Sequence, residues 1–421
     1  MSLTPVPPIR KMENAVSLRV RAILAVGLAA VLVPAAAAVA APKVSLQQRL
    51  AAALRSPALR STHSGATVLD LETGATVYAA DPGLSLLPAS NEKLAVTYGA
   101  LNELGPDYRI ETDAVSDGAQ DGDVWHGDLL LVGHGDPSLS KQGLAVLARQ
   151  IRADGIRVVD GRVLADESFF DTRRTALGWK PSFYVNESPP LSALIVNRGW
   201  TGRKTTTQPA LAAAQLFRAA LVAAGVSVAG GPGLGTAPDD ALPLAQLESP
   251  TVAELVRFMD RYSDNFTAEM LVKEVGAVSG SGGTTADGVG VITGLLQQIG
   301  VPLAGVRLVD GSGLSLLDRW TPAALADLLR SMWLDPDVHD ELLASLPVAA
   351  RTGTLAHRML HTAAAGFVRA KTGTTDRSSA LSGFVGDRFV FSVVQNGFPV
   401  PWTSARQAQD RFAAVLASAA H

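Results

Sequence analysis

The chain has 421 residues, of which 47% are hydrophobic and 18% charged, and its formal net charge is −3. This composition is typical of a globular protein, and the length predicts about two or three domains. The absence of cysteine excludes disulfide scaffolds, thiol nucleophiles and Cys-ligated zinc, so any covalent catalysis must use oxygen or nitrogen. The near balance of 36 Lys and Arg against 39 Asp and Glu, without a basic cluster, argues against a nucleic-acid partner.

Residues 1–40 have the pattern of a secretory signal peptide. Arg19 and Arg21 precede an uncharged stretch at 22–33, and a run of small residues follows it. Cleavage after Ala40 would export the protein to the periplasm or the extracellular space, with at most peripheral membrane contact. The alternative is an uncleaved anchor, because residues 22–42 carry no charge and are long enough to span a bilayer.

The segments that follow predict a helix, a β-hairpin and a second helix. Ser45–Leu54 is amphipathic, and the alternating segments Gly65–Leu71 and Ala75–Ala79 flank a turn. Helical periodicity then starts at Pro88 and stops at Gly105. The sequence therefore predicts two strands and two helices before residue 113.

Between residues 113 and 249 the pattern changes to short strands and turns. A second hairpin is predicted in which Ile156–Val159 and Arg162–Leu164 flank the turn Asp160-Gly161. A stretch rich in Gly and Pro at 230–243 closes the region. We interpret residues 113–249 as an inserted α/β domain.

Helices and then three strands are predicted after residue 250. Strands near both ends of the chain predict one antiparallel five-stranded sheet, flanked by helices and built from distant segments. We therefore expect an α+β fold in which residues 41–112 and 250–421 form one catalytic domain around the insertion. The expected elements are helices at 252–259, 266–275, 289–299 and 404–417, and strands at 366–371, 380–385 and 388–395.

Three short motifs carry the chemistry: Ser90-Asn91-Glu92-Lys93, Ser263-Asp264-Asn265 and Lys371-Thr372-Gly373. They match the S-x-x-K, S-D-N and K-T-G set of penicillin-binding proteins and serine β-lactamases. The i, i+3 spacing places Ser90 and Lys93 on one helix face, where a lysine can take the proton of a serine nucleophile. A lysine does so near neutral pH only if burial and cationic neighbours lower its pKa, and Lys371 is such a neighbour.

Two other segments resemble these motifs and have simpler interpretations. Ser138–Lys141 repeats the S-x-x-K spacing, and we interpret Ser138 as a helix N-cap after a turn. Arg351–Gly353 resembles K-T-G and is interpreted as an ordinary turn. Ser263 or Asp264 could likewise serve only as a helix N-cap. The sequence contains no H-E-x-x-H or G-x-S-x-G motif, and we expect neither a metal nor a cofactor.

At these residues the sequence resembles the S13 peptidases, the class C low-molecular-mass penicillin-binding proteins, which are D-alanyl-D-alanine carboxypeptidases/endopeptidases. The resemblance covers nearly all of the chain after the signal. It implies a penicillin-binding-protein/serine β-lactamase-like domain interrupted by an insertion. The further runs that carry it are Gly133–Leu139, Leu191–Asn197, Asp310–Ser315, Gly353–Leu355 and Ala370–Thr374.

The resemblance also implies roles for the motif residues. Ser90 would be the acylated nucleophile, Lys93 its base, and Ser263 the relay of a proton to the leaving D-alanine. Asn265 would bind the substrate amide, and the N–H groups of Ser90 and Thr374 would form the oxyanion hole. The implied catalytic residues are Ser90, Lys93, Ser263, Asn265 and Lys371, and the implied carboxylate-binding segment is Lys371, Thr372, Gly373 and Thr374.

By the same resemblance, the substrates would be peptidoglycan peptides or cross-links, β-lactams would be covalent inhibitors, and the exported protein would be associated with the cell wall. A serine β-lactamase is one alternative, but no motif between Ser90 and Ser263 marks a glutamate that would activate water. A catalytically silent cell-wall-binding homologue is another, although a binding role alone would not require all five catalytic residues.

Overall fold

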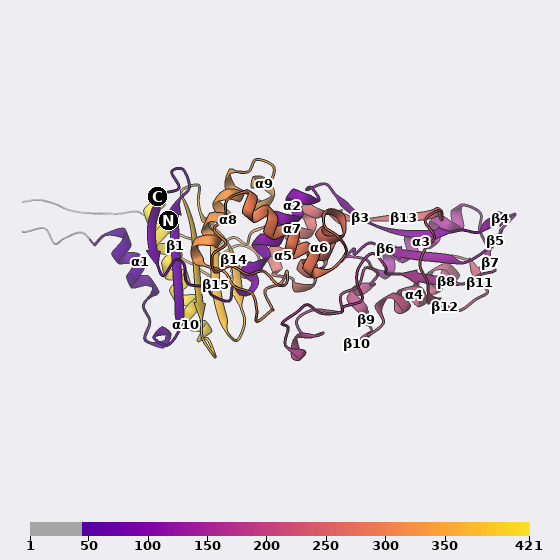
Figure 1. Ribbon diagram of the computed structural model, residues 1–421, viewed down its shortest axis with the longest axis horizontal. Coiled ribbons are helices and arrows are strands. Elements are labelled where there is room, and N and C mark those ends of the chain that lie inside the picture. The colour runs from indigo at the N-terminus through magenta and orange to yellow at the C-terminus, as the bar shows by residue number, and fades with distance from the viewer. Residues whose placement is uncertain (1–43) are drawn as a thin grey trace, which may run out of the picture. The chain divides into compact units, whose positions relative to one another are not determined.

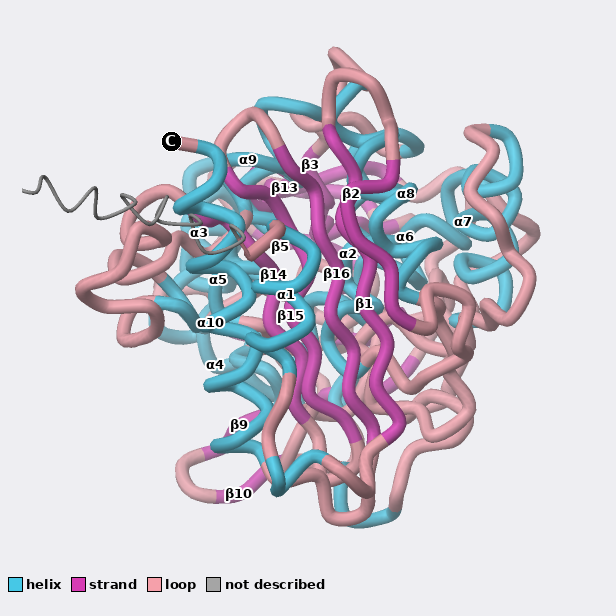
Figure 2. Tube along the Cα trace, turned by 90° about the vertical axis from the view of Figure 1, so that its left-hand side faces the viewer, coloured by secondary structure: helices cyan, strands magenta, loops and turns pink. Residues whose placement is uncertain are grey.

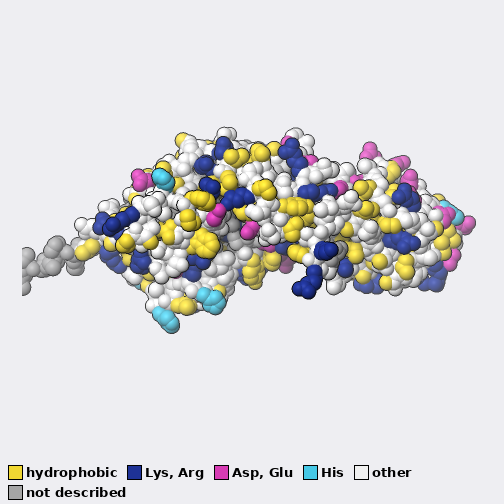
Figure 3. Space-filling view, turned by 90° about the horizontal axis from the view of Figure 1, so that it is seen from below, with side chains coloured by type: hydrophobic (Ala, Val, Ile, Leu, Met, Phe, Trp, Pro, Cys, Tyr) yellow, Lys and Arg dark blue, Asp and Glu magenta, His cyan; other side chains and the backbone are white. Residues whose placement is uncertain are grey.

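The structure, a computed structural model, describes residues 44–421, and the predicted signal peptide lies outside the described residues. Helices and strands are mixed along the chain (Figure 1), and the predicted α+β fold class is confirmed. Among residues 44–421, no helix is both long and apolar enough to cross a bilayer. On the face drawn in Figure 3, basic, acidic and hydrophobic side chains are interspersed.

The predicted five-stranded sheet is present, with the strand order β14-β15-β16-β1-β2. Every neighbouring pair is antiparallel, so strands from both ends of the chain share one sheet (Figure 2). All eight residues of the second strand, β15, are buried. The strands are β1 (His63–Asp70), β2 (Thr76–Ala80), β14 (Val368–Thr374), β15 (Ser378–Val385) and β16 (Phe389–Asn396).

Eight α-helices of the described chain lie outside residues 109–251, and those that touch the sheet cover it on both sides. The predicted helix after Pro88 is divided into a 3-10 turn, η2 (Ala89–Glu92), and the helix α2, and the helices α8 and α9 were not predicted. The eight are α1 (Leu46–Leu54), α2 (Lys93–Glu103), α5 (Val252–Tyr262), α6 (Asn265–Ser279), α7 (Thr285–Gln298), α8 (Pro322–Leu334), α9 (His339–Ser345) and α10 (Trp402–Ala420).

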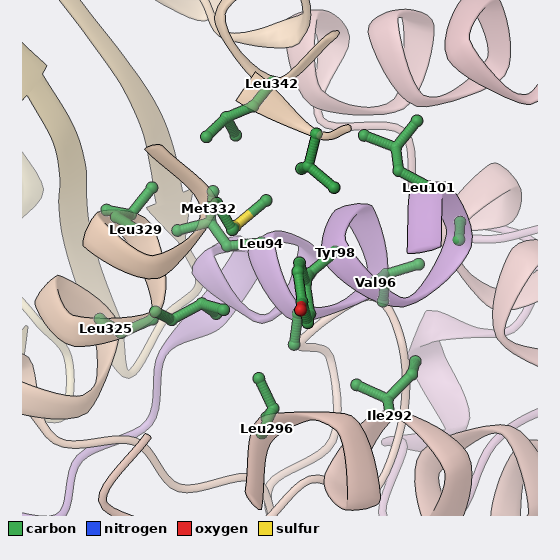
Figure 4. Close-up of a cluster of buried hydrophobic side chains, with 14 of the residues drawn as sticks. Leu94, Val96, Tyr98, Leu101, Ile292, Leu296, Leu325, Leu329, Met332 and Leu342 are labelled. Carbon is green, nitrogen blue, oxygen red and sulfur yellow. The ribbon is translucent and has the colours of Figure 1, made fainter. Parts of the chain in front are cut away.

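The two faces of the sheet are buried in different hydrophobic clusters. Alternation along β16 places Phe391 and Val393 in the cluster with α1 and α10, whereas Val390 and Val394 face the cluster that contains α8. The latter cluster surrounds α2 (Figure 4), where Leu94 points toward α8. Because α2 is buried along most of its length, the turn that precedes it is held between the sheet and the helices.

Residues 109–251 contain three further sheets and two helices. Their hydrophobic residues form a separate cluster around α3 and α4, neither of which was predicted by residue range. The sheets have the orders β12-β8-β6-β3-β13, β11-β7-β5-β4 and β10-β9. The elements are β3 (Arg109–Ser116), β4 (Ala119–Asp121), β5 (Val124–His126), β6 (Leu129–Gly133), α3 (Lys141–Ala153), β7 (Val158–Val159), β8 (Val163–Asp166), β9 (Trp200–Thr201), β10 (Lys204–Thr205), α4 (Pro209–Ala223), β11 (Ser227–Val228), β12 (Pro232–Leu234) and β13 (Leu242–Thr251).

The predicted hairpin around Asp160-Gly161 is wrong. Strand β7 pairs in parallel with β5 and β11, whereas β8 pairs in parallel with β6 and β12 of the other sheet. Gly161 does not adopt the positive φ that a two-residue hairpin turn requires. Instead it packs against the Gly127 carbonyl, which an added Cβ would approach to 2.1 Å. Asp160-Gly161 therefore connects β7 of one sheet to β8 of the other.

The boundaries proposed for the insertion, residues 113 and 249, stay a prediction. The paired strands of the inserted sheets extend slightly beyond them, from Arg109 in β3 to Thr251 in β13. Thr251 also caps α5, because its side chain accepts a hydrogen bond from the Glu254 N–H. The chain therefore passes from the inserted sheet into a helix of the predicted catalytic domain without a linker.

Leu416 tests the packing of α10, because it is fully buried in the cluster between this helix and the sheet. We expect Leu416→Ala to lower the free energy of unfolding by about 2–5 kcal/mol, since it leaves a cavity. The matched control is Leu234→Ala, at a side chain that is 59% exposed, which should change it by less than about 0.5 kcal/mol. Urea denaturation measures both, and equal losses in the two variants would contradict the packing described.

Candidate active site

The turn that carries Ser90 is fixed by close packing of backbone. Ala89, the preceding residue, has a φ of 48°, which is uncommon for a residue other than glycine. Gly313 also has a positive φ, of 79°, and a Cβ there would lie 1.9 Å from the Ala89 carbonyl oxygen. A Cβ on Gly373 would lie 2.7 Å from the Pro88 carbonyl oxygen. Only glycine fits at both places, so β14 and the 310–315 segment hold the turn from two sides.

Lys93 lies at the start of α2 and is completely buried. Its Nζ donates hydrogen bonds to Ser90 Oγ at 3.0 Å, Asn265 Oδ1 at 2.8 Å and the Ser312 carbonyl oxygen at 2.6 Å. Burial lowers the pKa of Lys93 to about 8, although Asp310 and Glu269 oppose the shift. The side chain is therefore prepared to lose its proton near neutral pH.

Two of the three partners of Lys93 can only accept hydrogen bonds. A carbonyl oxygen and the oxygen of a side-chain amide have no proton to donate, whereas the Ser90 hydroxyl can do either. The Asn265 amide is oriented by its own nitrogen, which donates to the Glu187 carbonyl at 2.9 Å. A neutral Lys93 would thus keep its two N–H groups on Asn265 and Ser312, and its lone pair would face the Ser90 hydroxyl.

Ser263 and Asn265 reach the site from the junction of two helices. Ser263 ends α5 in the left-handed region, with φ at 59°. Asp264 is the N-cap of α6, because its side chain accepts from the Thr267 N–H, and it also pairs with Arg198 at 2.7 Å. The predicted capping role therefore belongs to Asp264, and it leaves Ser263 and Asn265 free to face the two lysines.

Lys371 lies on β14 and is also completely buried. Its Nζ donates to Ser263 Oγ at 2.8 Å and to the Thr372 carbonyl oxygen at 3.1 Å. Burial and then the positive charge of Lys93 lower the pKa of Lys371 to about 7. The backbone of the strand is tied to the Ser90 turn, since Asn91 Nδ2 donates to the Lys371 carbonyl at 3.1 Å.

The residues after Lys371 continue along β14 toward the exposed end of the site. Thr372 is mostly buried, and its hydroxyl lies 2.7 Å from that of Thr354. Thr374 is half-buried, and its hydroxyl accepts a hydrogen bond from Arg406 of α10 at 3.3 Å. The structure thus brings together all of the site residues predicted from the motifs, and it adds a guanidinium beside Thr374.

The two additional motif copies do not supply side chains to the two buried lysines. Ser138 is not the N-cap that we predicted: its N–H and hydroxyl both donate to Asp136 Oδ1, and Ser140 caps α3. Arg351 and Thr352 form a turn, as expected, and Gly353 is the first residue of a short 3-10 helix. Neither copy contributes a side chain to the contacts of Lys93 or Lys371 described above.

Sequence reasoning missed the backbone groups that hold the site. The Ser312 carbonyl lies in a segment quoted above only for its family resemblance, and the Glu187 carbonyl had no signal at all, because any residue type supplies a carbonyl. Asn91 was within the first motif but had no assigned role. Among residues 44–421, no group of three or more His, Cys, Asp or Glu is arranged to hold a metal ion.

Comparison with known proteins gives consistent matches over nearly the whole described chain. A model described as the D-Ala-D-Ala carboxypeptidase 3 (S13) family matches residues 46–209 and 201–419. A D-alanyl-D-alanine carboxypeptidase of Actinomadura sp. (strain R39) is 35% identical over 459 residues, covering 88% of this chain and 84% of that protein. Carboxypeptidase DacB of Mycolicibacterium smegmatis is 32% identical, covering 89% of this chain and 84% of that protein.

Among solved structures, penicillin binding protein 4 (dacB) of Haemophilus influenzae has the same fold. Its TM-score is 0.78 at 19% identity, covering 88% of this chain and 98% of that chain. The Haemophilus protein has also been solved in complex with a β-lactam. The likeness confirms the predicted penicillin-binding-protein-like fold.

The coupling between the two buried lysines can be tested directly. Lys93→Met removes the positive charge that lowers the pKa of Lys371, so we expect that pKa to rise above about 7. NMR of protein labelled with ¹³C at the lysine ε-carbons would follow the titration. Lys273→Met is the control, because Lys273 is another buried lysine that pairs with Asp171 instead. An unchanged Lys371 titration in Lys93→Met would contradict the coupling.

Proposed function

Since this chain belongs to the D-Ala-D-Ala carboxypeptidase 3 (S13) family and is a D-alanyl-D-alanine carboxypeptidase, we propose that it works through a covalent acyl-enzyme on Ser90. The observation that carries the proposal is the set of partners around Lys93. Two of its three hydrogen-bond partners, Asn265 Oδ1 and the Ser312 carbonyl, are obligatory acceptors, and Ser90 is the third. A neutral Lys93 can therefore take a proton only from Ser90.

In the acylation step, Ser90 Oγ attacks the carbonyl carbon of the penultimate D-alanine while its proton moves to Lys93 Nζ. The C–O bond forms and the carbonyl π electrons move to oxygen. We assign the N–H groups of Ser90 and Thr374 to this oxyanion, because Ser90 lies in the first turn before a helix and Thr374 lies at the half-buried end of β14. The arrangement stabilises the charge that develops in the transition state.

The tetrahedral intermediate then collapses with loss of the terminal D-alanine. The C–N bond breaks as its nitrogen takes a proton from the Ser263 hydroxyl, and Lys371 returns a proton to Ser263 across their 2.8 Å hydrogen bond. Water then attacks the ester carbonyl while its proton passes through Ser263 to Lys371. The bond to Ser90 Oγ breaks as this oxygen takes back the proton held by Lys93, which frees the shortened peptide and restores both lysines. Asn265 Nδ2 carries two N–H groups, so one can donate to the substrate amide while the other keeps its hydrogen bond to the Glu187 carbonyl.

The charged end of the substrate fits the second half of the site. We propose that Lys371, Thr372 and Thr374 bind the terminal carboxylate, with Gly373 allowing the strand to lie against the Ser90 turn. Arg406, whose guanidinium donates to the Thr374 hydroxyl at 3.3 Å, adds a positive charge at this end. A free carboxylate distinguishes a C-terminal D-alanine from an internal residue, which fits carboxypeptidase action.

We further propose that the substrates are peptidoglycan peptides or cross-links, cleaved outside the cytoplasm after export by the predicted signal peptide. A β-lactam would be attacked by the same Ser90 hydroxyl, and opening of its ring leaves an ester that blocks the nucleophile. A β-lactam complex of the Haemophilus influenzae protein, which has the same fold, supports this assignment.

Replacement of the nucleophile gives the primary test. We expect Ser90→Ala to lose labelling by a fluorescent penicillin and to hydrolyse a diacyl-L-Lys-D-Ala-D-Ala peptide at least about a thousandfold more slowly. Ser138→Ala is the matched control, since it changes the other S-x-x-K serine and should keep both activities. Labelling that persists in Ser90→Ala would refute the proposal, and rapid loss of the label in the wild type would favour a β-lactamase.

The pH dependence tests the base. Protonated Lys93 cannot accept the Ser90 proton, so kcat/KM for the peptide should fall as the pH drops through about 8, the pKa to which burial lowers this lysine. The pH profile of kcat/KM reports the free enzyme and is the appropriate measurement. An acidic limb centred near the ordinary pKa of a carboxyl group, about 4, would instead assign the base to Asp or Glu.

A further inference from the structure

We infer that Trp179 and Asp310 are positioning residues for Lys93. A loop of the inserted segment thereby helps to orient the hydrogen-bond acceptors of the base. The inference rests on the proposed function, because it assigns these residues to the base of the acylation step. Trp179 lies within the predicted insertion, and Asp310 begins the segment Asp310–Ser315, whose side chains have so far been given no role. Neither side chain contacts Ser90 in the hydrogen bonds described.

The first step of the argument is that the Ser312 carbonyl is held from two sides. Glu269 Oε1 accepts hydrogen bonds from the N–H groups of Gly311 and Ser312, at 3.1 and 2.8 Å. Asp310 Oδ1 accepts from the Gly313 N–H at 2.7 Å. These bonds fix the peptide groups on both sides of Ser312, whose carbonyl oxygen lies 2.6 Å from Lys93 Nζ.

Asp310 is the centre of this segment. Besides the Gly313 N–H, it accepts from the Ser315 N–H at 2.8 Å, the Ser312 hydroxyl at 3.2 Å and the Trp179 Nε1–H at 2.7 Å. Four hydrogen bonds therefore fix the position of this one carboxyl group. The Asp310 side chain is almost completely buried, so its charge acts on Lys93 through a medium with little water.

Trp179 connects Asp310 to the inserted segment. Its indole donates to the carboxylate across 131 positions of sequence, and the neighbouring Gly178 carbonyl accepts from the Leu316 N–H at 3.1 Å. The same inserted loop supplies the Glu187 carbonyl that orients Asn265, and its Lys180 forms an ion pair with Asp376 at 2.5 Å. Residues 178–187 therefore contact Asn265 directly and are linked to the Ser312 segment through Asp310.

Among the acidic groups around Lys93, Asp310 has the largest electrostatic effect on its pKa. Burial raises the pKa of Glu92 well above its ordinary value and that of Glu269 to about 8, so both carboxyl groups ionise less readily than in water. Asp310 is the largest opposing influence on the lowered pKa of Lys93. The ionisable groups that face Lys93 or this cluster are Glu92 on η2, Asp260 on α5, Asp264 and Glu269 at α6, Lys371 on β14, and Asp310 and Asp318 between α7 and α8.

Trp179→Phe is the sharpest test, because it removes one N–H donor and keeps an aromatic ring. We expect the second-order rate of acylation by a fluorescent penicillin, and kcat for the peptide, to fall by about tenfold, with KM changed by less than about threefold. Trp125→Phe is the matched control: Trp125 is a buried tryptophan on β5 of the inserted segment, and its indole donates to Ser116 at 2.8 Å and not to a residue of the site. It should keep the wild-type rate.

Asp310→Asn tests the charge of Asp310 through the pH–rate profile, which would not change if Asp310 had only a structural role. Loss of the negative charge should lower the pKa of Lys93, so the acidic limb of the pH–rate profile should move to lower pH by about one unit. A wild-type acylation rate in Trp179→Phe, an equal loss in Trp125→Phe, or a rise of KM alone would overturn the inference. Labelling that survives Ser90→Ala would instead overturn the proposed function, so the two failures are distinguishable.

Discussion

Burial of the Lys93 amino group is the constraint on which the rest of the site depends. A buried ammonium is unstable unless each N–H group finds an acceptor, and any acceptor that is missing costs free energy that the fold must supply elsewhere. The 3-10 turn before α2 offers only the Ser90 hydroxyl. The other two acceptors, Asn265 and Ser312, lie 172 and 219 positions further along the chain. Distant segments must therefore meet within hydrogen-bonding distance of one atom.

The fold meets this requirement by packing backbone against backbone. Strand β14 and the 310–315 segment both approach the Ser90 turn so closely that only Gly373 and Gly313 fit at the contacts. Behind the turn, α2 is surrounded by hydrophobic side chains from α7 and α8 and cannot shift without opening the core. The position of Lys93 thus follows from the rigidity of its surroundings, and its lowered pKa follows from the same burial.

The sequence predicted what depends on side-chain identity and missed what depends on backbone. The five strands of the sheet were recognisable because their local patterns are strong, and the serines and lysines of the site belong to motifs. Helix α8 was missed because most of its residues are buried and its sequence has little polar–apolar alternation. The prediction of a hairpin at Asp160-Gly161 was wrong because the sequence does not distinguish a glycine needed for close approach from one needed for a positive φ. Likewise, the carbonyls of Glu187 and Ser312 have no signature in any residue type.

The two lysines differ in the order in which they give and take protons. Each faces one serine, Lys93 facing Ser90 and Lys371 facing Ser263. When Lys93 accepts the proton of Ser90, it becomes positively charged, and this charge lowers the pKa of Lys371. Lys371 then gives up a proton more readily, through Ser263, at the moment when the leaving nitrogen needs one. In the proposed mechanism, uptake of a proton at one end of the site thus favours its release at the other, because two buried ammonium groups repel each other.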